Sequence, residues 1–136
     1  MTGVAIPPRR VGRSILAIVV GFVVCFVLSV GTDMIFHATN VYPPPDQPML
    51  DTKLLLLALS YRLVYDGFGS YLAARLAPDR PMFHAMLLGF IGLAFAVTGA
   101  IVMRGFAPDW YPWTLAATVL PTAWIGGRLY VRSIRP

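Results

Sequence analysis

The sequence predicts an all-α integral membrane protein, a bundle of four transmembrane helices with both termini on the same, cytoplasmic side. The 136 residues are 57% hydrophobic and only 12% charged, whereas charged residues make up about 25% of a typical soluble domain. Spans of roughly 20 residues each would place about 80 residues in the bilayer and leave the remainder for tails and connections. We therefore expect a single membrane domain over residues 1–136.

Long apolar runs predict the individual helices. The run from Ser14 to Thr32 carries no charge and is too long for the apolar part of a signal peptide, which favours a retained first helix. The runs Met82–Met103 and Trp110–Gly127 are also uncharged. Leu54–Ala74 has the length of a span although it holds two charges. Together these runs predict helices at approximately residues 14–36, 53–76, 82–104 and 110–131.

The three connections are rich in proline and polar residues, as expected for breakers between helices. Asp79 before Pro81, and Asp109 before Pro112, fit an acidic N-cap followed by a proline in the first helical turn. Pro121 interrupts the fourth helix and predicts a kink there.

The basic residues predict the orientation of the bundle. On the side of the termini eight arginines accompany one acid, Asp79, whereas the opposite side carries Lys53 and Arg104 against three acids. The positive-inside rule then makes both termini cytoplasmic, as in a multi-pass protein of the bacterial cytoplasmic (inner) membrane. Aromatic residues fit the two membrane interfaces, with Trp110, Tyr111 and Trp113 outside and Tyr130 inside. The eight arginines are Arg9, Arg10, Arg13, Arg75, Arg80, Arg128, Arg132 and Arg135.

The net charge of +5 reports this topology. A nucleic-acid-binding protein would need its basic residues gathered on one face, so we expect the lipid bilayer as a partner and no nucleic acid.

Small residues recur at three- and four-residue spacing and predict close helix packing, because association within lipid depends on side chains that let backbones approach. Such stripes on all four helices exceed what a lone bundle needs to bury, so we expect a homo-oligomer or a membrane-protein partner. The clearest stripe, in the third helix, is Ala85, Gly89, Gly92, Ala96 and Gly99.

Arg62 and Asp66 are the charges that do not fit a membrane span. They lie about 13 and 20 Å below the outer surface, at about 1.5 Å per residue, and each charge near the centre costs about 2.5–3.5 kcal/mol on insertion scales. Four residues apart, they share one helical face and can pair within the helix. Tyr61, Tyr65 and Ser70 complete this candidate intramembrane polar site.

Two interpretations of this site remain open at the sequence level. In the first, Arg62 and Asp66 are a buried ion pair that fixes the register of the helix. In the second, Asp66 couples a proton or cation, or Arg62 holds an anionic headgroup, in a cavity lined by the small-residue faces.

Asp33 and His37 form a second candidate polar pair at the outer end of the first helix. A carboxylate beside an imidazole favours a pH-sensitive contact, but two residues are too few for a zinc site, so no metal is expected. Alternatively, Asp33 reaches Arg62, because guanidinium groups extend toward the nearer surface.

No cofactor or catalytic site is indicated. His37 is expected near the outer membrane surface and His84 near the inner one, so the two cannot ligate one haem iron within a monomer. Ser70 has no histidine at its depth in the membrane to act as a base. Cys25 is the single cysteine and has no partner for a disulfide, so it is expected to pack as a small apolar residue.

Two functions of different class follow from these features. The first is a non-catalytic accessory or assembly component that packs through its small-residue helix faces. The second is a small oligomeric transporter or channel that uses the midplane residues Arg62 and Asp66. An enzyme is the least supported class.

Overall fold

The computed structural model describes residues 10–135 and confirms an all-helical protein with four helices. The helix ends differ from those predicted by at most three residues. Arg9, one of the arginines assigned to the inner side, lies outside the described residues. The helices are α1 (Val11–Ala38), α2 (Thr52–Leu76), α3 (Pro81–Val102) and α4 (Trp110–Ser133). Two of them, α1 and α3, are long and apolar enough to cross a membrane.

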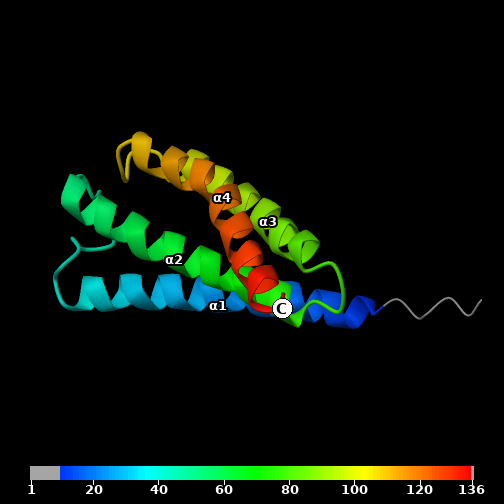
Figure 1. Cartoon of the computed structure of the whole chain (residues 1–136). Coiled ribbons are helices and arrows are strands. Elements are labelled where there is room, and N and C mark those ends of the chain that lie inside the picture. The colour runs from blue at the N-terminus through cyan, green and yellow to red at the C-terminus, as the bar shows by residue number, and fades with distance from the viewer. Residues whose placement is uncertain (1–9, 136) are drawn as a thin grey trace, which may run out of the picture.

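The helices do not form a regular square bundle (Figure 1). Helix α2 lies between α1 and α4 and contacts both, and α4 also packs along α3. Within the described residues α1 and α4 do not contact each other, and α1 and α3 touch over a short stretch only. In Figure 1, α1 and α3 diverge toward the end that carries the α1–α2 and α3–α4 connections.

The helix starts use different capping devices. The carboxylate of Asp51 accepts a hydrogen bond of 2.8 Å from the backbone N–H of Lys53 and caps α2. The acidic caps expected for the next two helices are wrong in detail. Arg80, in the left-handed conformation with φ 44°, occupies the N-cap of α3 in place of Asp79, and Asp109 occupies the N-cap of α4 but makes no side-chain cap.

Small side chains make the helix contacts. Apart from Leu55, the fully buried residues are alanines, glycines or other small residues. A methyl group on Gly21 would lie 2.6 Å from the carbonyl oxygen of Gly69, so α1 and α2 touch backbone to backbone there. A methyl group on Gly126 would meet the carbonyl oxygen of Gly67 and would lie 3.0 Å from the amide of Tyr71, at the crossing of α2 and α4.

Helix α4 bends midway along its length (Figure 1), and Pro121 lies inside it. Proline has no N–H to donate to the preceding turn, and its ring clashes with that turn, so a bend is expected there. Beyond the bend α4 carries Gly126 and Gly127, which approach α2 and α3 respectively.

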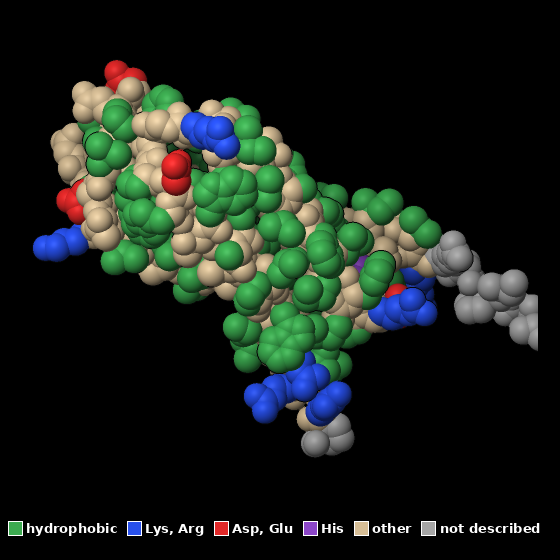
Figure 2. Space-filling model, turned by 90° about the horizontal axis from the view of Figure 1, so that it is seen from above, with side chains coloured by type: hydrophobic (Ala, Val, Ile, Leu, Met, Phe, Trp, Pro, Cys, Tyr) green, Lys and Arg blue, Asp and Glu red, His purple; other side chains and the backbone are tan. Residues whose placement is uncertain are grey.

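Charged side chains gather at the two ends of the molecule, and the surface between them is largely hydrophobic (Figure 2). Acidic side chains lie mainly at the end of the α1–α2 and α3–α4 connections, which we call the acidic end. Basic side chains dominate the other end, where α1 begins and α4 ends.

Candidate functional site

A cavity of about 480 Å³ opens between the four helices. Its lining is mainly apolar, and the small-residue stripe of α3, predicted from spacing alone, forms one wall through Gly89, Gly92, Ala96 and Gly99. Without bulky side chains on that wall, the space between α3 and the other helices stays open. Among residues 10–135, the only formally charged residues that line the cavity are Arg62 and Asp66, both from α2. The sequence-predicted pair therefore faces a cavity, not a dry helix interface.

Asp66 has no basic partner among the described residues. One carboxylate oxygen accepts a hydrogen bond from the Cys25 thiol across the α1–α2 contact, with an Sγ–Oδ1 distance of 2.8 Å. Ser70, one turn further along α2, is buried and lines the same cavity. A thiol is a weak donor, so the Cys25 hydrogen bond compensates little of the negative charge of an ionised Asp66.

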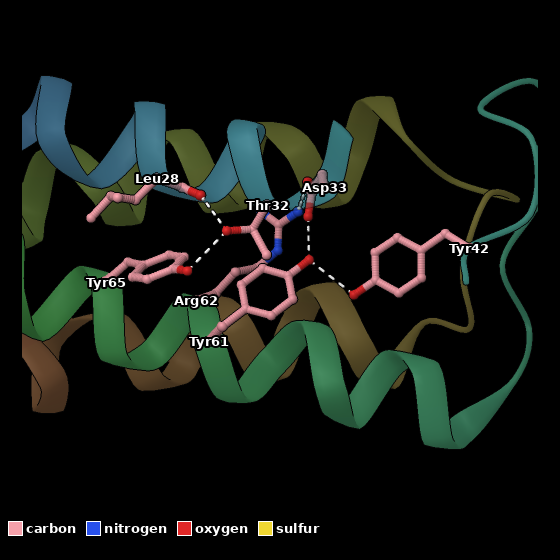
Figure 3. A network of polar contacts seen from close by, with 7 residues as sticks. All are labelled: Leu28, Thr32, Asp33, Tyr42, Tyr61, Arg62 and Tyr65. Atoms are coloured by element: carbon pink, nitrogen blue, oxygen red, sulfur yellow. Dashed lines mark hydrogen bonds and ion pairs between the residues drawn. The ribbon is translucent and has the colours of Figure 1, made fainter. Parts of the chain in front are cut away.

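The ion pair within α2 that the sequence suggested is not present in this structure. Arg62 pairs instead with Asp33 of α1, through its Nη2 atom and one carboxylate oxygen. The sequence had offered this pairing as an alternative, because a guanidinium group extends toward the nearer membrane surface. The interhelical pair forms because the guanidinium lies toward the acidic end, where Asp33 faces α2 (Figure 3). Arg62 Nε is buried and has no hydrogen-bond partner within residues 10–135.

Tyrosines extend the ion pair into a network (Figure 3). Tyr61 donates a hydrogen bond to the second carboxylate oxygen of Asp33. Its own oxygen lies 2.9 Å from the hydroxyl of Tyr42, which must be the donor because the Tyr61 proton is already used. Tyr42 comes from the α1–α2 connection and is only 4% exposed, and this burial raises the pKa of its hydroxyl, which keeps it protonated as a donor.

Tyr65 lies outside this network. Its hydroxyl is 2.8 Å from Thr32 Oγ1, and Thr32 donates its own proton to the carbonyl oxygen of Leu28. Tyr65 therefore donates a hydrogen bond to Thr32. This bond ties α2 to α1 one helical turn further along α2 than the contact between Tyr61 and Asp33 (Figure 3).

The structure separates the second candidate pair. The carboxylate of Asp33 is engaged by Tyr61 and Arg62, whereas His37 Nδ1 lies 2.7 Å from the carbonyl oxygen of Pro43. Both residues line a smaller pocket of about 200 Å³ at the acidic end, which we call the outer pocket. Within the described residues no group of three or more His, Cys, Asp or Glu side chains lies close enough to hold a metal ion.

One wall divides the outer pocket from the cavity. Arg62, Phe106, Ala107 and Tyr111 line both spaces. A backbone hydrogen bond of 2.8 Å from Met49 to Phe106 joins the α1–α2 and α3–α4 connections over this region. Arg62 is thus placed between Asp33 on the outer side and Asp66 on the inner side.

Comparisons with protein-family models, with curated proteins and with solved structures find no match to this chain. Three features of the site bear on its function: the cavity, the Asp66 carboxylate that has no basic partner among the described residues, and the Arg62–Asp33 ion pair at the wall shared with the outer pocket.

Sequence reasoning missed two residues of the site. Cys25 was assigned to packing, yet its thiol is the hydrogen-bond donor to Asp66. Tyr111 was assigned to the interfacial aromatic belt, yet it lines the wall between the two spaces. The spacing of Cys25 from Gly21 and Ser29 along one face of α1 was the available signal, since that face packs on α2. No comparable signal existed for Tyr111.

Proposed function

We propose that this protein crosses the bilayer four times, with both termini in the cytoplasm. The support is the inverted distribution of side chains. A soluble bundle buries its large apolar residues, whereas here the core is mostly alanine and other small residues, and most large apolar residues face outward on all four helices. Helices that pack through small residues and present bulky apolar ones to their surroundings are typical of membranes. The outward residues include Val19, Phe26, Leu56, Phe68, Phe90, Phe95, Trp124 and Leu129.

The separation of charge supports the orientation. The acidic end faces outward and the arginine-rich end lies in the cytoplasm, in keeping with the positive-inside rule. Helices of 28, 25, 22 and 24 residues each exceed the roughly 20 residues that span a hydrocarbon core.

The α2–α3 connection distinguishes four spans from two. If α1 and α3 alone cross the membrane, Asp79 lies outside; if all four helices cross, it lies in the cytoplasm. We expect an impermeant maleimide added to intact cells to label Asp46→Cys, in a Cys25→Ala background, and to leave Asp79→Cys unlabelled until the cells are permeabilised. Labelling of Asp79→Cys in intact cells would contradict the four-span topology.

We further propose that the cavity binds a hydrophobic monovalent cation in exchange for a proton, as in a small transporter. The observation that carries this is the lone carboxylate of Asp66 in a largely apolar cavity whose one basic residue is already paired with Asp33. An isolated ionised carboxylate is costly in such surroundings. The empty site therefore holds a proton on Asp66, and an apolar cation that replaces this proton satisfies both the charge and the apolar walls.

The size of the cavity also fits such a ligand. Binding sites for organic molecules span about 300–1,000 Å³ and combine apolar walls with a few polar groups, and this cavity has about 480 Å³. Among the described residues, the titratable groups that line the cavity together with Asp66 are Cys25 from α1, Arg62 from α2 and Tyr111 from α4, while the α3 wall contributes none. Asp66 is thus the one group that can offer an unpaired negative charge.

Two tetraphenyl ions of matched size and opposite charge test this function. Tetraphenylphosphonium is expected to bind the purified protein in nanodiscs of neutral lipid, and tetraphenylborate is not. Binding is measured by equilibrium dialysis against empty nanodiscs, which corrects for partition of both ions into lipid. Failure of the protein to bind tetraphenylphosphonium would reject the proposal.

The accessory or assembly role stays a prediction, as does the homo-oligomer. The small-residue stripes that favoured a partner are used within the chain, at Gly21 against Gly69, Gly126 against Gly67 and Gly89 against Ala123, or they line the cavity. No remaining stripe argues for a partner, so we rank this role second.

A further inference from the structure

We propose that Arg62 alternates between Asp33 and Asp66, so that Asp33 forms a second, outer cation-accepting site whenever Arg62 pairs with Asp66. This inference rests on the proposed cation-binding function of the cavity. It adds a site for a proton or small cation in the outer pocket and assigns to Arg62 the role of an internal counter-ion.

Charge balance leads to this arrangement. Asp33 and Asp66 carry two negative charges when ionised. Within the described part of the chain, Arg62 and the imidazole of His37 are the only basic groups that line the cavity or the outer pocket. One acid is therefore always without its arginine. The position of Arg62 decides whether the uncompensated charge faces the cavity, at Asp66, or the outer pocket, at Asp33.

Geometry allows the exchange. Arg62 and Asp66 lie four residues apart on α2 and line the same cavity, and residues at this spacing are neighbours on a helix surface. Arg62 also lines the outer pocket with Asp33, so its side chain borders both spaces. A change of side-chain rotamer is enough to move the guanidinium from one acid to the other, without a shift of the helix.

The present contacts of Arg62 leave its hydrogen-bonding capacity unfilled. Its Nη2 atom is bound to Asp33, but the buried Nε atom has no partner. A buried donor without a partner is costly. The Asp33-bound position is thus not a fully satisfied structural ion pair, which fits a residue with a second position.

The exchange balances charge at each step. When the cation or proton on Asp66 leaves, Arg62 leaves Asp33 and takes its place at Asp66. Asp33 then accepts a proton or small cation from the outer pocket. In the reverse direction the charge on Asp33 leaves, Arg62 returns to Asp33, and Asp66 receives the next proton or cation. Each acid holds one positive charge in both states.

Cys25 supplies a direct reporter because it is the single cysteine of the chain and its thiol donates to Asp66. Its S–H stretching band in the infrared shifts when this hydrogen bond is lost. We expect Asp33→Asn to free Arg62, which then pairs with Asp66 and displaces the thiol. The band should move to the position seen in Asp66→Asn, where the acceptor charge is removed outright.

The double variant Asp33→Asn with Arg62→Gln separates this exchange from general disturbance of the site. In Asp33→Asn alone, tetraphenylphosphonium affinity is expected to fall at least about tenfold. In the double variant no Arg62 is present to displace the thiol, so Cys25 donates to Asp66 again. The S–H band should then return to its wild-type position, and the tetraphenylphosphonium affinity should recover. Cys25→Ala identifies the band, and Asp33→Ser repeats the test should Asp33→Asn not accumulate.

A wild-type band position in both Asp33→Asn and Asp33→Ser would overturn the exchange, since Arg62 would then not reach Asp66. No shift in Asp66→Asn would overturn it as well, because the thiol contact on which it depends would be missing. Both results are independent of ligand binding. Loss of the exchange with intact tetraphenylphosphonium binding would therefore leave the proposed function standing.

Discussion

Asp66→Asn is expected to abolish the charge-selective binding of tetraphenylphosphonium while the protein remains inserted and folded. Asparagine keeps the shape of the side chain, but it removes the negative charge that Asp66, alone among the described residues of the cavity lining, offers to a ligand. Loss of one partner from a desolvated charge pair costs about 2–5 kcal/mol, so affinity should fall roughly 30-fold or more. Equilibrium dialysis of the variant in nanodiscs measures this change.

Asp46→Asn provides the matched control. Asp46 is an exposed carboxylate on the α1–α2 connection at the same acidic end, and it lines neither the cavity nor the outer pocket. The substitution Asp46→Asn removes one charge from the protein without altering the site. The variant should therefore bind tetraphenylphosphonium like the wild type. Equal affinities for Asp66→Asn and wild type would show that Asp66 does not hold the cation. Failure of Asp66→Asn to insert would favour the interpretation of Asp66 as a structural residue.

Gly126→Ala is expected to have the largest effect on stability. The added methyl group would meet the carbonyl oxygen of Gly67 and the amide of Tyr71, both backbone groups of α2 that cannot move aside separately. The crossing of α2 and α4 would have to open, which we expect to lower the free energy of unfolding by about 1–3 kcal/mol, as for other overpacked sites. Unfolding in mixed detergent and denaturing micelles, followed by circular dichroism, measures this loss.

Gly31→Ala is the control for that substitution. A methyl group at Gly31 meets no atom within 4 Å, and alanine is the better helix former, so this variant should be as stable as the wild type or slightly more stable. Similar stabilities for the two variants would contradict the close α2–α4 crossing.

The fold was largely predictable because the apolar runs are long and separated by proline-rich connections. The helix caps were less predictable. Asp79 and Asp109 had the right chemistry for capping, but neither makes the bond, since the local backbone, with Arg80 at positive φ, decides which side chain can reach the first turn. The small-residue stripes predicted close packing without showing whether the partner was another helix of the chain or a second protein.

The charged residues of the candidate site could be predicted from the sequence, but the contacts that they make could not. Arg62 and Asp66 stood out because charges are costly in a span. The partner of Arg62 could not be derived from the sequence. Asp66 lies four residues away on the same helix, and Asp33 lies across the contact between α1 and α2. The choice depends on the register of α1 against α2, which close contact at Gly21 and Gly69 sets. That register places Asp33 opposite Arg62 and Cys25 opposite Asp66.

We propose that the cavity offers one unpaired negative charge to an apolar ligand. The ratio of the dissociation constants of tetraphenylborate and tetraphenylphosphonium for the wild-type protein, measured in one nanodisc preparation, tests it most directly. These ions share their phenyl groups and differ in the sign of their charge, so the ratio isolates the electrostatic contribution of the site. We predict at least about tenfold tighter binding of the cation, equivalent to about 1.4 kcal/mol. Equal binding of both ions, or tighter binding of the anion, would contradict the account.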